Sequence, residues 1–184
     1  LLPLWIQDWR IRSSILVMVL NLKALIRTLL GVPENHLLTA LCEGLTIYNP
    51  KGGSQLPGVA ESWDISPDGL IYTFKLNKDA KWSNGDAVTA DDFVWSWKRI
   101  LTASLGSQYP DMLYYVKNAE KYHLGEISDF SEVGVKAIDA HTLKVNLKSP
   151  TPFFLGLLSH YSTWPVHKET VLKPVSYTHL TLPT

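Results

Sequence analysis

The sequence predicts an α+β fold, because two pairs of strand patterns enclose two helical patterns along the chain. Short runs rich in β-forming residues cover 60–65 and 70–76, and a second pair covers 135–138 and 142–147. Apolar residues at helical spacing lie between the pairs, and a short helical run over 153–158 follows them. Two hairpins packed with helices would form a compact subdomain.

The first hairpin is predicted by the turn between its two strands. Pro67 presets φ at the second turn position, Asp68 can hydrogen-bond its own backbone, and Gly69 tolerates positive φ. Every second residue of the following strand is apolar, which predicts that one strand face is buried. These apolar residues are Leu70, Tyr72, Phe74 and Leu76.

The first helix is predicted by a turn and a cap. Asn84-Gly85 is a strong turn dipeptide, and Thr89 then stands where a helix should begin. Thr89 can accept a hydrogen bond from the backbone N–H of Asp92, and acidic residues suit the positive end of the helix dipole. Because the third helical residue is Asp, the sequence predicts a loose capping box.

A second helix is predicted from Tyr109-Pro110 through Leu124, with Gly125 as its stop signal. Its expected apolar side carries Met112, Tyr115, Ala119 and Tyr122. The second hairpin is expected to turn around 139–141, with Leu143, Val145 and Leu147 on one face. Pro152 is placed to open the short final helix.

Composition excludes several functional classes. The 184 residues include 17 basic and 17 acidic side chains, so the formal net charge is zero. No basic stripe indicates nucleic-acid binding, and no polybasic run indicates a membrane surface. The one cysteine, Cys42, cannot form an intramolecular disulfide. We expect it in a helix over 35–45, as a buried thiol that behaves as a small hydrophobic group.

The sequence gives no positive sign of catalysis. The six histidines form neither an HExxH pattern nor a Cys/His zinc spacing, so no metal site is predicted. The nucleophile elbow, the phosphate-binding loop and the dinucleotide fingerprint are all absent. The paired acids Asp91 and Asp92 already have a capping role. The sequence therefore predicts no enzyme and no cofactor.

Motifs spread along the chain resemble one protein family. In order they are GVPEN at 31–35, EGL at 43–45, GVAESW at 58–63, AKWSNG at 80–85, VTADDFVWSWKR at 88–99 and GVKAIDAHTL at 134–143. They resemble the extracytoplasmic solute-binding proteins of peptide ABC importers, of the oligopeptide-binding type. The resemblance runs from about 31 to about 173. Its strongest block, 58–99, is expected to be scaffold, with Trp63, Trp82, Trp95 and Trp97 in the core.

The resemblance implies a fold and a function. The fold is part of the first lobe of a two-lobed, type II periplasmic-binding-protein-like structure that closes on its ligand. The function is capture of oligopeptides and their delivery to a membrane-embedded ABC permease. The implied ligand is an extended peptide held by main-chain hydrogen bonds, with its side chains in hydrated pockets. The implied protein is a monomer that is periplasmic, or lipid-anchored on the outer face of a Gram-positive membrane.

Two residues match positions that contact ligand in the family. Val32, in the GVPEN motif, is the implied backbone contact to the peptide, and Tyr109 is the implied aromatic lip of a pocket. Each has a structural alternative: Val32 as an ordinary loop residue before Pro33, and Tyr109 as a hydrophobic staple at a helix start. The family's anchor for the peptide's N-terminal amine lies in the second lobe, which this chain does not contain.

The ends of the chain depart from the family pattern. Regrouping the codons of residues 17–28 by one base permits a string that resembles the family's first strand and turn. We therefore expect 1–30 to be a frame-shifted or otherwise non-native segment and 31–173 to be the lobe portion. Residues 174–184 resemble translated vector sequence and are expected to be a non-native tail, so the chain is interpreted as a fragment.

Other functions remain open on the sequence. Regulatory and signalling proteins reuse this lobe as a ligand sensor, and an upstream DNA-binding domain would favour that interpretation. Dipeptide-, murein-peptide- and nickel-binding relatives are also possible within the importer class. GVPEN and GVKAIDAHTL favour the oligopeptide and murein-peptide branch.

Overall fold

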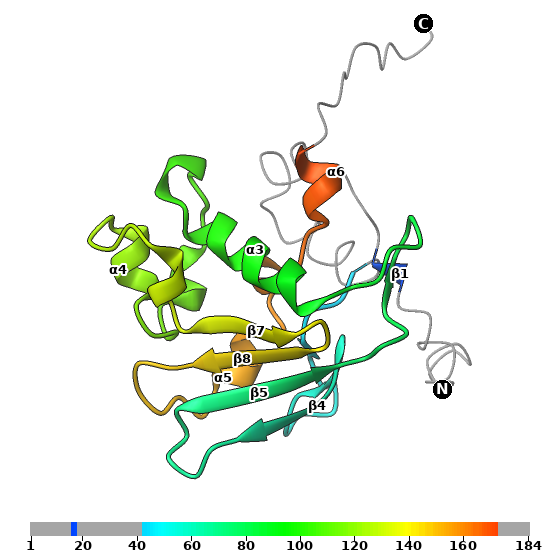
Figure 1. The fold of residues 1–184 in the computed structure, drawn as a ribbon. Helices are drawn as coiled ribbons and strands as arrows, with labels where there is room; N and C mark the ends of the chain where they lie inside the picture. Colours follow the sequence, from blue (N-terminus) through cyan, green and yellow to red (C-terminus); the bar gives the residue numbers. More distant parts are fainter. Residues whose placement is uncertain (1–15, 18–41, 173–184) are drawn as a thin grey trace, which may run out of the picture.

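A four-stranded antiparallel sheet forms the centre of the computed structural model, which describes residues 16–17 and 42–172 (Figure 1). The sheet order is β4-β5-β8-β7, and the strands are β4 (Ala60–Ile65), β5 (Ile71–Leu76), β7 (Val135–Asp139) and β8 (Thr142–Asn146). Both predicted hairpins are confirmed. Pairing of β5 with β8, which sets Tyr72 opposite Val145, joins them into one sheet.

The turn between β4 and β5 has the predicted chemistry. Gly69 has a φ of 69°, and its N–H donates to the Ser66 carbonyl at 2.8 Å. The carboxylate of Asp68 accepts from the N–H of Leu70 at 3.0 Å. The turn therefore sets the register that buries Tyr72 and leaves the next residue facing the opposite side of the sheet.

Helix α3 (Ala90–Leu101) begins after Thr89, as predicted. The Thr89 N–H donates to Asp92 Oδ2 at 2.8 Å, and the Thr89 hydroxyl donates to the same oxygen at 3.0 Å. This capping box satisfies a donor that the helix itself cannot use. The turn before the helix is also present, since Gly85 has a φ of 92° and its N–H donates to the Trp82 carbonyl.

The single helix predicted from 110 to 124 is wrong. Two short helices replace it, η4 (Pro110–Leu113) and α4 (Ala119–His123). Between them the chain pairs with the end of β8, because Lys117 N–H donates to Asn146 O and Lys148 N–H donates to Tyr115 O, both at 2.9 Å. Leu113 and Val116 are buried together with Ala119 from the predicted apolar side, whereas the other three residues of that side are half-buried. The predicted stop at Gly125 is correct, with a φ of 79°.

The helix predicted over 35–45 is also not observed in its described part. Residues 42–45 are not helical, and residues 35–41 lie outside the described residues. Gly44 O accepts from Val59 N–H at 2.9 Å and Leu45 O from Ala60 N–H at 3.1 Å, so this segment pairs with the start of β4. Cys42 is half-buried, where a buried thiol was expected.

Short elements complete the described chain. They are β1 (Leu16–Val17), β2 (Thr46–Ile47), β3 (Leu56–Pro57), β6 (Lys81–Trp82), η3 (Ala103–Leu105), η5 (Phe130–Glu132), α5 (Phe154–Leu157), η6 (Tyr161–Thr163) and α6 (Lys168–Leu172). β2 pairs antiparallel with β3, and β1 pairs parallel with β6. Within the described ranges, no helix is both long enough and apolar enough to span a bilayer.

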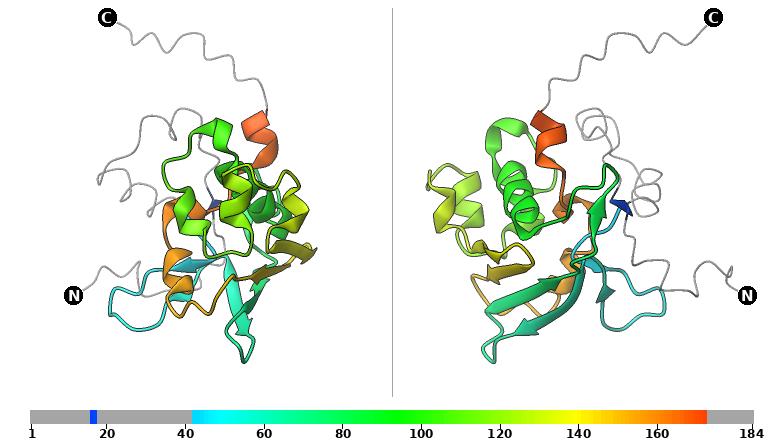
Figure 2. Two further views of the ribbon diagram at one scale, coloured as in Figure 1. Left: turned by 90° about the vertical axis from the view of Figure 1, so that its left-hand side faces the viewer. Right: turned by 45° about the vertical axis from the view of Figure 1, so that its right-hand side comes forward.

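The core lies against one face of the sheet. Figure 2 shows α3 and α4 on the β7 side of the sheet, and Figure 1 shows α5 behind it. Phe74 and Leu143 from the sheet are fully buried, as are Phe93 and Trp97 from α3. Trp82 is also buried. Of the four tryptophans expected in the core, Trp82 and Trp97 are therefore confirmed there. Trp63 and Trp95 are only half-buried.

Candidate functional site

Three ring side chains meet where η4 and η6 come together. The ring of Tyr109 lies edge-on to that of His160, with centroids 5.5 Å apart, and edge-on to that of Tyr161 at 6.0 Å. The His160 and Tyr161 rings are 4.2 Å apart. All three residues are half-buried. We call Tyr109, His160 and Tyr161 the aromatic cluster.

The backbone around η6 is held rigidly from the core. The indole N–H of Trp97 donates to the Thr163 carbonyl at 2.8 Å, and both residues are 1% exposed. The Thr163 hydroxyl donates to the carbonyls of Leu158 and His160, at 3.1 and 2.9 Å. These buried hydrogen bonds fix the turn that presents His160 and Tyr161.

The surroundings of His160 favour its neutral form. Burial lowers the pKa of His160 below its ordinary value, while the negative charge of Asp111 acts in the opposite direction. The Ser162 N–H points at Nδ1 from 3.4 Å, and the Ser162 hydroxyl lies 2.8 Å from the same atom. Nδ1 is therefore assigned as the acceptor, and the ring proton of the neutral form is on Nε2.

The contact between His160 and Ser162 has a structural role. The contact between Ser162 and His160 is local, since the two residues are neighbours in one turn, and it caps η6. A catalytic pair would need a third group that orients the imidazole. Among residues 42–172 no hydrogen bond to His160 Nε2 is seen. The same part of the chain holds no group of three side chains suited to a metal ion.

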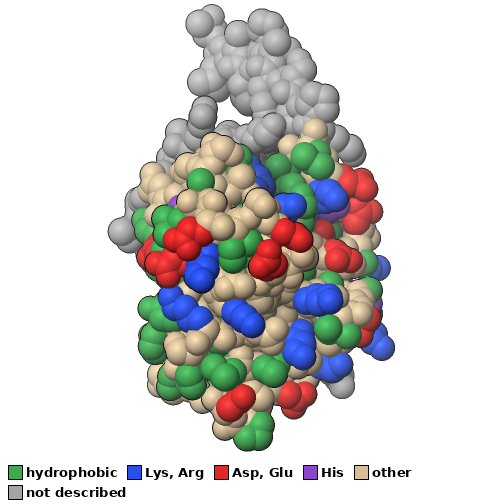
Figure 3. All heavy atoms as spheres, turned by 60° about the vertical axis from the view of Figure 1, so that its left-hand side comes forward, with side chains coloured by type: hydrophobic (Ala, Val, Ile, Leu, Met, Phe, Trp, Pro, Cys, Tyr) green, Lys and Arg blue, Asp and Glu red, His purple; other side chains and the backbone are tan. Residues whose placement is uncertain are grey.

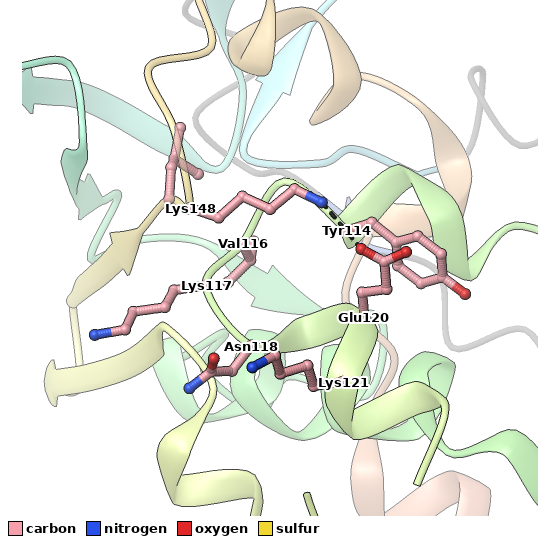
Figure 4. A pocket seen from close by; sticks show the side chains of 8 residues that line it. Tyr114, Val116, Lys117, Asn118, Glu120, Lys121 and Lys148 are labelled. Atoms are coloured by element: carbon pink, nitrogen blue, oxygen red, sulfur yellow. Dashed lines mark hydrogen bonds and ion pairs between the residues drawn. The ribbon is translucent and has the colours of Figure 1, made fainter. Parts of the chain in front are cut away.

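A concave feature lies apart from the aromatic cluster. It is a hollow of about 390 Å³ beside η4 and α4, lined by the side chains of Tyr114, Lys117, Asn118, Lys121 and Lys148 among others (Figure 4). Lys148 Nζ reaches Glu120 at 3.1 Å across it. The hollow and the aromatic cluster share no residue, so the largely cationic hollow is a different site from the one that the sequence predicted.

Of the two predicted site residues, the structure places one. Tyr109 immediately precedes η4, and its ring lies edge-on to the rings of His160 and Tyr161 at the start of η6. Val32 lies outside the described residues. Sequence reasoning missed His160 and Tyr161 as neighbours of Tyr109. No local signal marks that contact, because it joins segments about fifty residues apart.

Comparison with known proteins places this geometry in a family. Residues 55–180 match the model described as "Bacterial extracellular solute-binding proteins, family 5 Middle". The periplasmic oligopeptide-binding protein OppA of Escherichia coli is 45% identical over 145 residues, which is 78% of this chain and 26% of that protein. The chain thus spans about a quarter of the length of the curated relatives it matches.

Solved structures agree in fold. The Haemophilus influenzae OppA complex with RPPGFSPFR has a TM-score of 0.70 at 40% identity, over 76% of this chain and 27% of that one. The pheromone receptor PrgZ has a TM-score of 0.72 at 31% identity, over 77% of this chain and 28% of that one. The expected α+β part of a type II periplasmic-binding-protein-like fold is therefore confirmed. The chain belongs to family 5 of the bacterial extracellular solute-binding proteins.

Proposed function

We propose that this chain is part of an extracytoplasmic receptor that captures oligopeptides and delivers them to an ABC permease. The observation that carries the proposal is the family match together with the likeness to a relative solved in complex with a peptide. The half-buried aromatic cluster supplies a surface of the kind that such a ligand needs. The receptor acts by binding and release, without a catalytic step.

Tyr109 is the proposed aromatic lip of a peptide pocket. Its ring is supported edge-on by His160 and Tyr161, which pre-organises it and reduces the entropy lost on binding. Val32 is proposed as a main-chain contact to the peptide on the strength of its motif. In this scheme the peptide is extended, its backbone is hydrogen-bonded like an added strand, and water fills the space around its side chains.

The proposed receptor works as a monomer outside the cytoplasmic membrane. It is periplasmic, or lipid-anchored in a Gram-positive cell, and its partners are the peptide and a membrane-embedded permease. The names of relatives as periplasmic binding proteins support this location. No nucleic acid is involved.

A chimaera tests the proposal directly. Residues 42–172 of this chain would replace the matching segment of the E. coli relative, and peptide binding would be measured by calorimetry. We expect the chimaera to bind tripeptides to pentapeptides, and Tyr109→Ala to weaken that binding by about tenfold, since a supported aromatic contact contributes about 1–2 kcal/mol. Tyr109→Phe should retain most of the affinity.

The matched control is Tyr48→Ala, because Tyr48 is 69% exposed and has no ring contact with the aromatic cluster. A folded chimaera without peptide affinity would contradict the receptor proposal. Equal losses of peptide affinity for Tyr48→Ala and Tyr109→Ala would contradict the role of Tyr109 but not the receptor proposal.

A second candidate function is detection of a peptide signal. The likeness to the pheromone receptor PrgZ favours it, at 31% identity. Transport receptors with hydrated pockets accept many peptides, whereas a signal receptor should discriminate. A panel of unrelated peptides tested on the same chimaera separates the two: similar affinities favour transport, and one strongly preferred sequence favours signalling.

A further inference from the structure

The outer face of the sheet carries a row of lysines that are far apart in the sequence. Along β8 and its extension, Leu143, Val145 and Leu147 are buried, so the alternate residues face the other side of the sheet. Two of these are Lys144 and Lys148. The neighbouring strand β7 places Lys136 directly opposite Lys144.

The segment between η4 and α4 extends the row. Val116 bridges to Leu147, and the Lys117 N–H donates to the Asn146 carbonyl. Lys117 therefore lies opposite Asn146, on the same outer side as Lys144. We call Lys117, Lys136, Lys144 and Lys148 the lysine face. Figure 3 shows one face of the molecule with blue Lys and Arg side chains across its middle and red Asp and Glu side chains above and below them.

The cations of the lysine face are only partly balanced. Lys117, Lys136 and Lys148 are exposed and Lys144 is half-buried. In the described ranges, the salt bridge between Lys148 and Glu120 is the one ion pair that this face forms.

Two acids on the strands of the sheet lie off the row. Asp64 stands beyond Thr73, two strands away from Lys144, and Asp139 interacts with Lys75. Like charges directly opposite each other on neighbouring strands are destabilising, so the Lys136–Lys144 pair has a cost that a negative partner would relieve.

One end of the lysine face leads into the hollow beside α4. Lys117 and Lys148 belong to both, and Lys121 adds a further exposed cation there. In Figure 4 the Lys148 side chain reaches toward Glu120 while Lys117 points away from it. The exposed ring of Phe153 stands edge-on to that of Tyr115, with centroids 5.3 Å apart, and the Tyr115 carbonyl accepts from the Lys148 N–H. Cations and an exposed aromatic ring thus occur together.

We propose that the lysine face docks this protein onto an anionic phospholipid surface. The cations are all lysine, which acts as a point charge and suits a diffuse negative layer. Protein interfaces instead favour arginine, which binds carboxylates in a fixed fork, and they are depleted in lysine. An exposed aromatic ring beside cations is typical of surfaces that lie in the headgroup region. Docking of this kind would hold a receptor close to a membrane, independently of whether it binds peptide.

Vesicle binding tests the proposal with the 184-residue chain. Phosphatidylcholine vesicles with a third of phosphatidylglycerol would be sedimented with the protein, against vesicles of phosphatidylcholine alone. We expect binding to the anionic vesicles only, and its loss in about 1 M salt, where the Debye length is about 3 Å. Lys136→Gln with Lys144→Gln should lower the partition coefficient by roughly 25-fold, at about fivefold for each lysine.

The matched control is Lys51→Gln with Lys78→Gln, which removes the same charge from two exposed lysines outside β7 and β8. Equal losses of vesicle binding in the two double variants would show that only net charge matters, and would overturn the proposal. Equal binding to both kinds of vesicle would also overturn it. Lysine-dependent binding to polyglutamate without vesicle binding would show that the partner is an acidic protein.

The first double variant should fold, because it removes a like-charge pair. Far-UV circular dichroism and thermal unfolding would check this. If the variant does not fold, Lys117→Gln with Lys136→Gln replaces it, since both side chains are exposed, and the same fold-change is expected.

Discussion

The indole N–H of Trp97 donates a 2.8 Å hydrogen bond to the carbonyl of Thr163, and so connects α3 to the turn that carries the aromatic cluster. Trp97→Phe keeps an aromatic ring but leaves that buried carbonyl without its donor. We expect a loss of about 2 kcal/mol in the free energy of unfolding, measured by urea denaturation. Trp95→Phe, at a half-buried position on the same helix, should cost less than about 1 kcal/mol. Equal costs for both would show that the hydrogen bond contributes nothing.

The capping box of α3 gives a second prediction. Asp92→Ala removes the oxygen that accepts from the Thr89 N–H and hydroxyl, so we expect a loss of about 1–2 kcal/mol in unfolding free energy. Asp91→Ala is the control. This exposed neighbour interacts favourably with the helix dipole, so its removal should lower the unfolding free energy by about 0.5 kcal/mol. The prediction fails if the two variants unfold at the same urea concentration.

The half-buried imidazole of His160 predicts a dependence of stability on pH. Burial lowers the pKa of His160 from 6.5 in the folded state, so the unfolded chain takes up its proton first as the pH falls. Stability from this group is fully present above about pH 6.5 and decreases as the pH falls from there through the lowered folded pKa. His160→Gln should therefore lose less stability than the parent between neutral and mildly acid pH.

Asp111 supplies the matched variant for this test. Its charge raises the pKa of His160 against the effect of burial, so Asp111→Asn should lower that pKa further and increase the acid-induced loss. Thermal unfolding at several pH values measures both variants. If His160→Gln retains the full acid sensitivity of the parent, other groups determine it.

The isolated chain is expected to bind peptides weakly or not at all. The family resemblance places the anchor for the peptide's amine in a second lobe, and this chain spans about a quarter of its curated relatives. The aromatic cluster by itself offers three half-buried rings, which is too little contact to offset the entropy of binding. Calorimetric titration with tripeptides measures this, and micromolar binding would contradict the expectation.

Local sequence determined the features whose causes are local. The turn at 66–69, the cap formed by Thr89 and Asp92, and the strand alternation that buries Tyr72 and Phe74 all follow from residues a few positions apart. The same is true of the stop at Gly125. In each case the backbone conformation or the buried face is fixed by neighbouring side chains, so the sequence could be interpreted without the rest of the chain.

The wrong helix over 110–124 shows where local reasoning failed. Its apolar spacing was acceptable for a helix, but the amide and carbonyl groups of residues 115–117 found partners on the extension of β8. Asn118, with a φ of 62°, then turns the chain into α4. A helix propensity of a few tenths of a kcal/mol per residue is easily outweighed by such tertiary pairing.

By itself, the sequence determined the α+β class, the hairpins, the first helix and the family. Only the tertiary structure brought Tyr109 against His160 and Tyr161, joined the hairpins through β5 and β8, and aligned four separate lysines on one face. Charge along the chain had indicated no membrane surface, because the lysines are dispersed between residues 117 and 148. Contacts between distant segments depend on the register of strands, which is set only when the whole sheet forms.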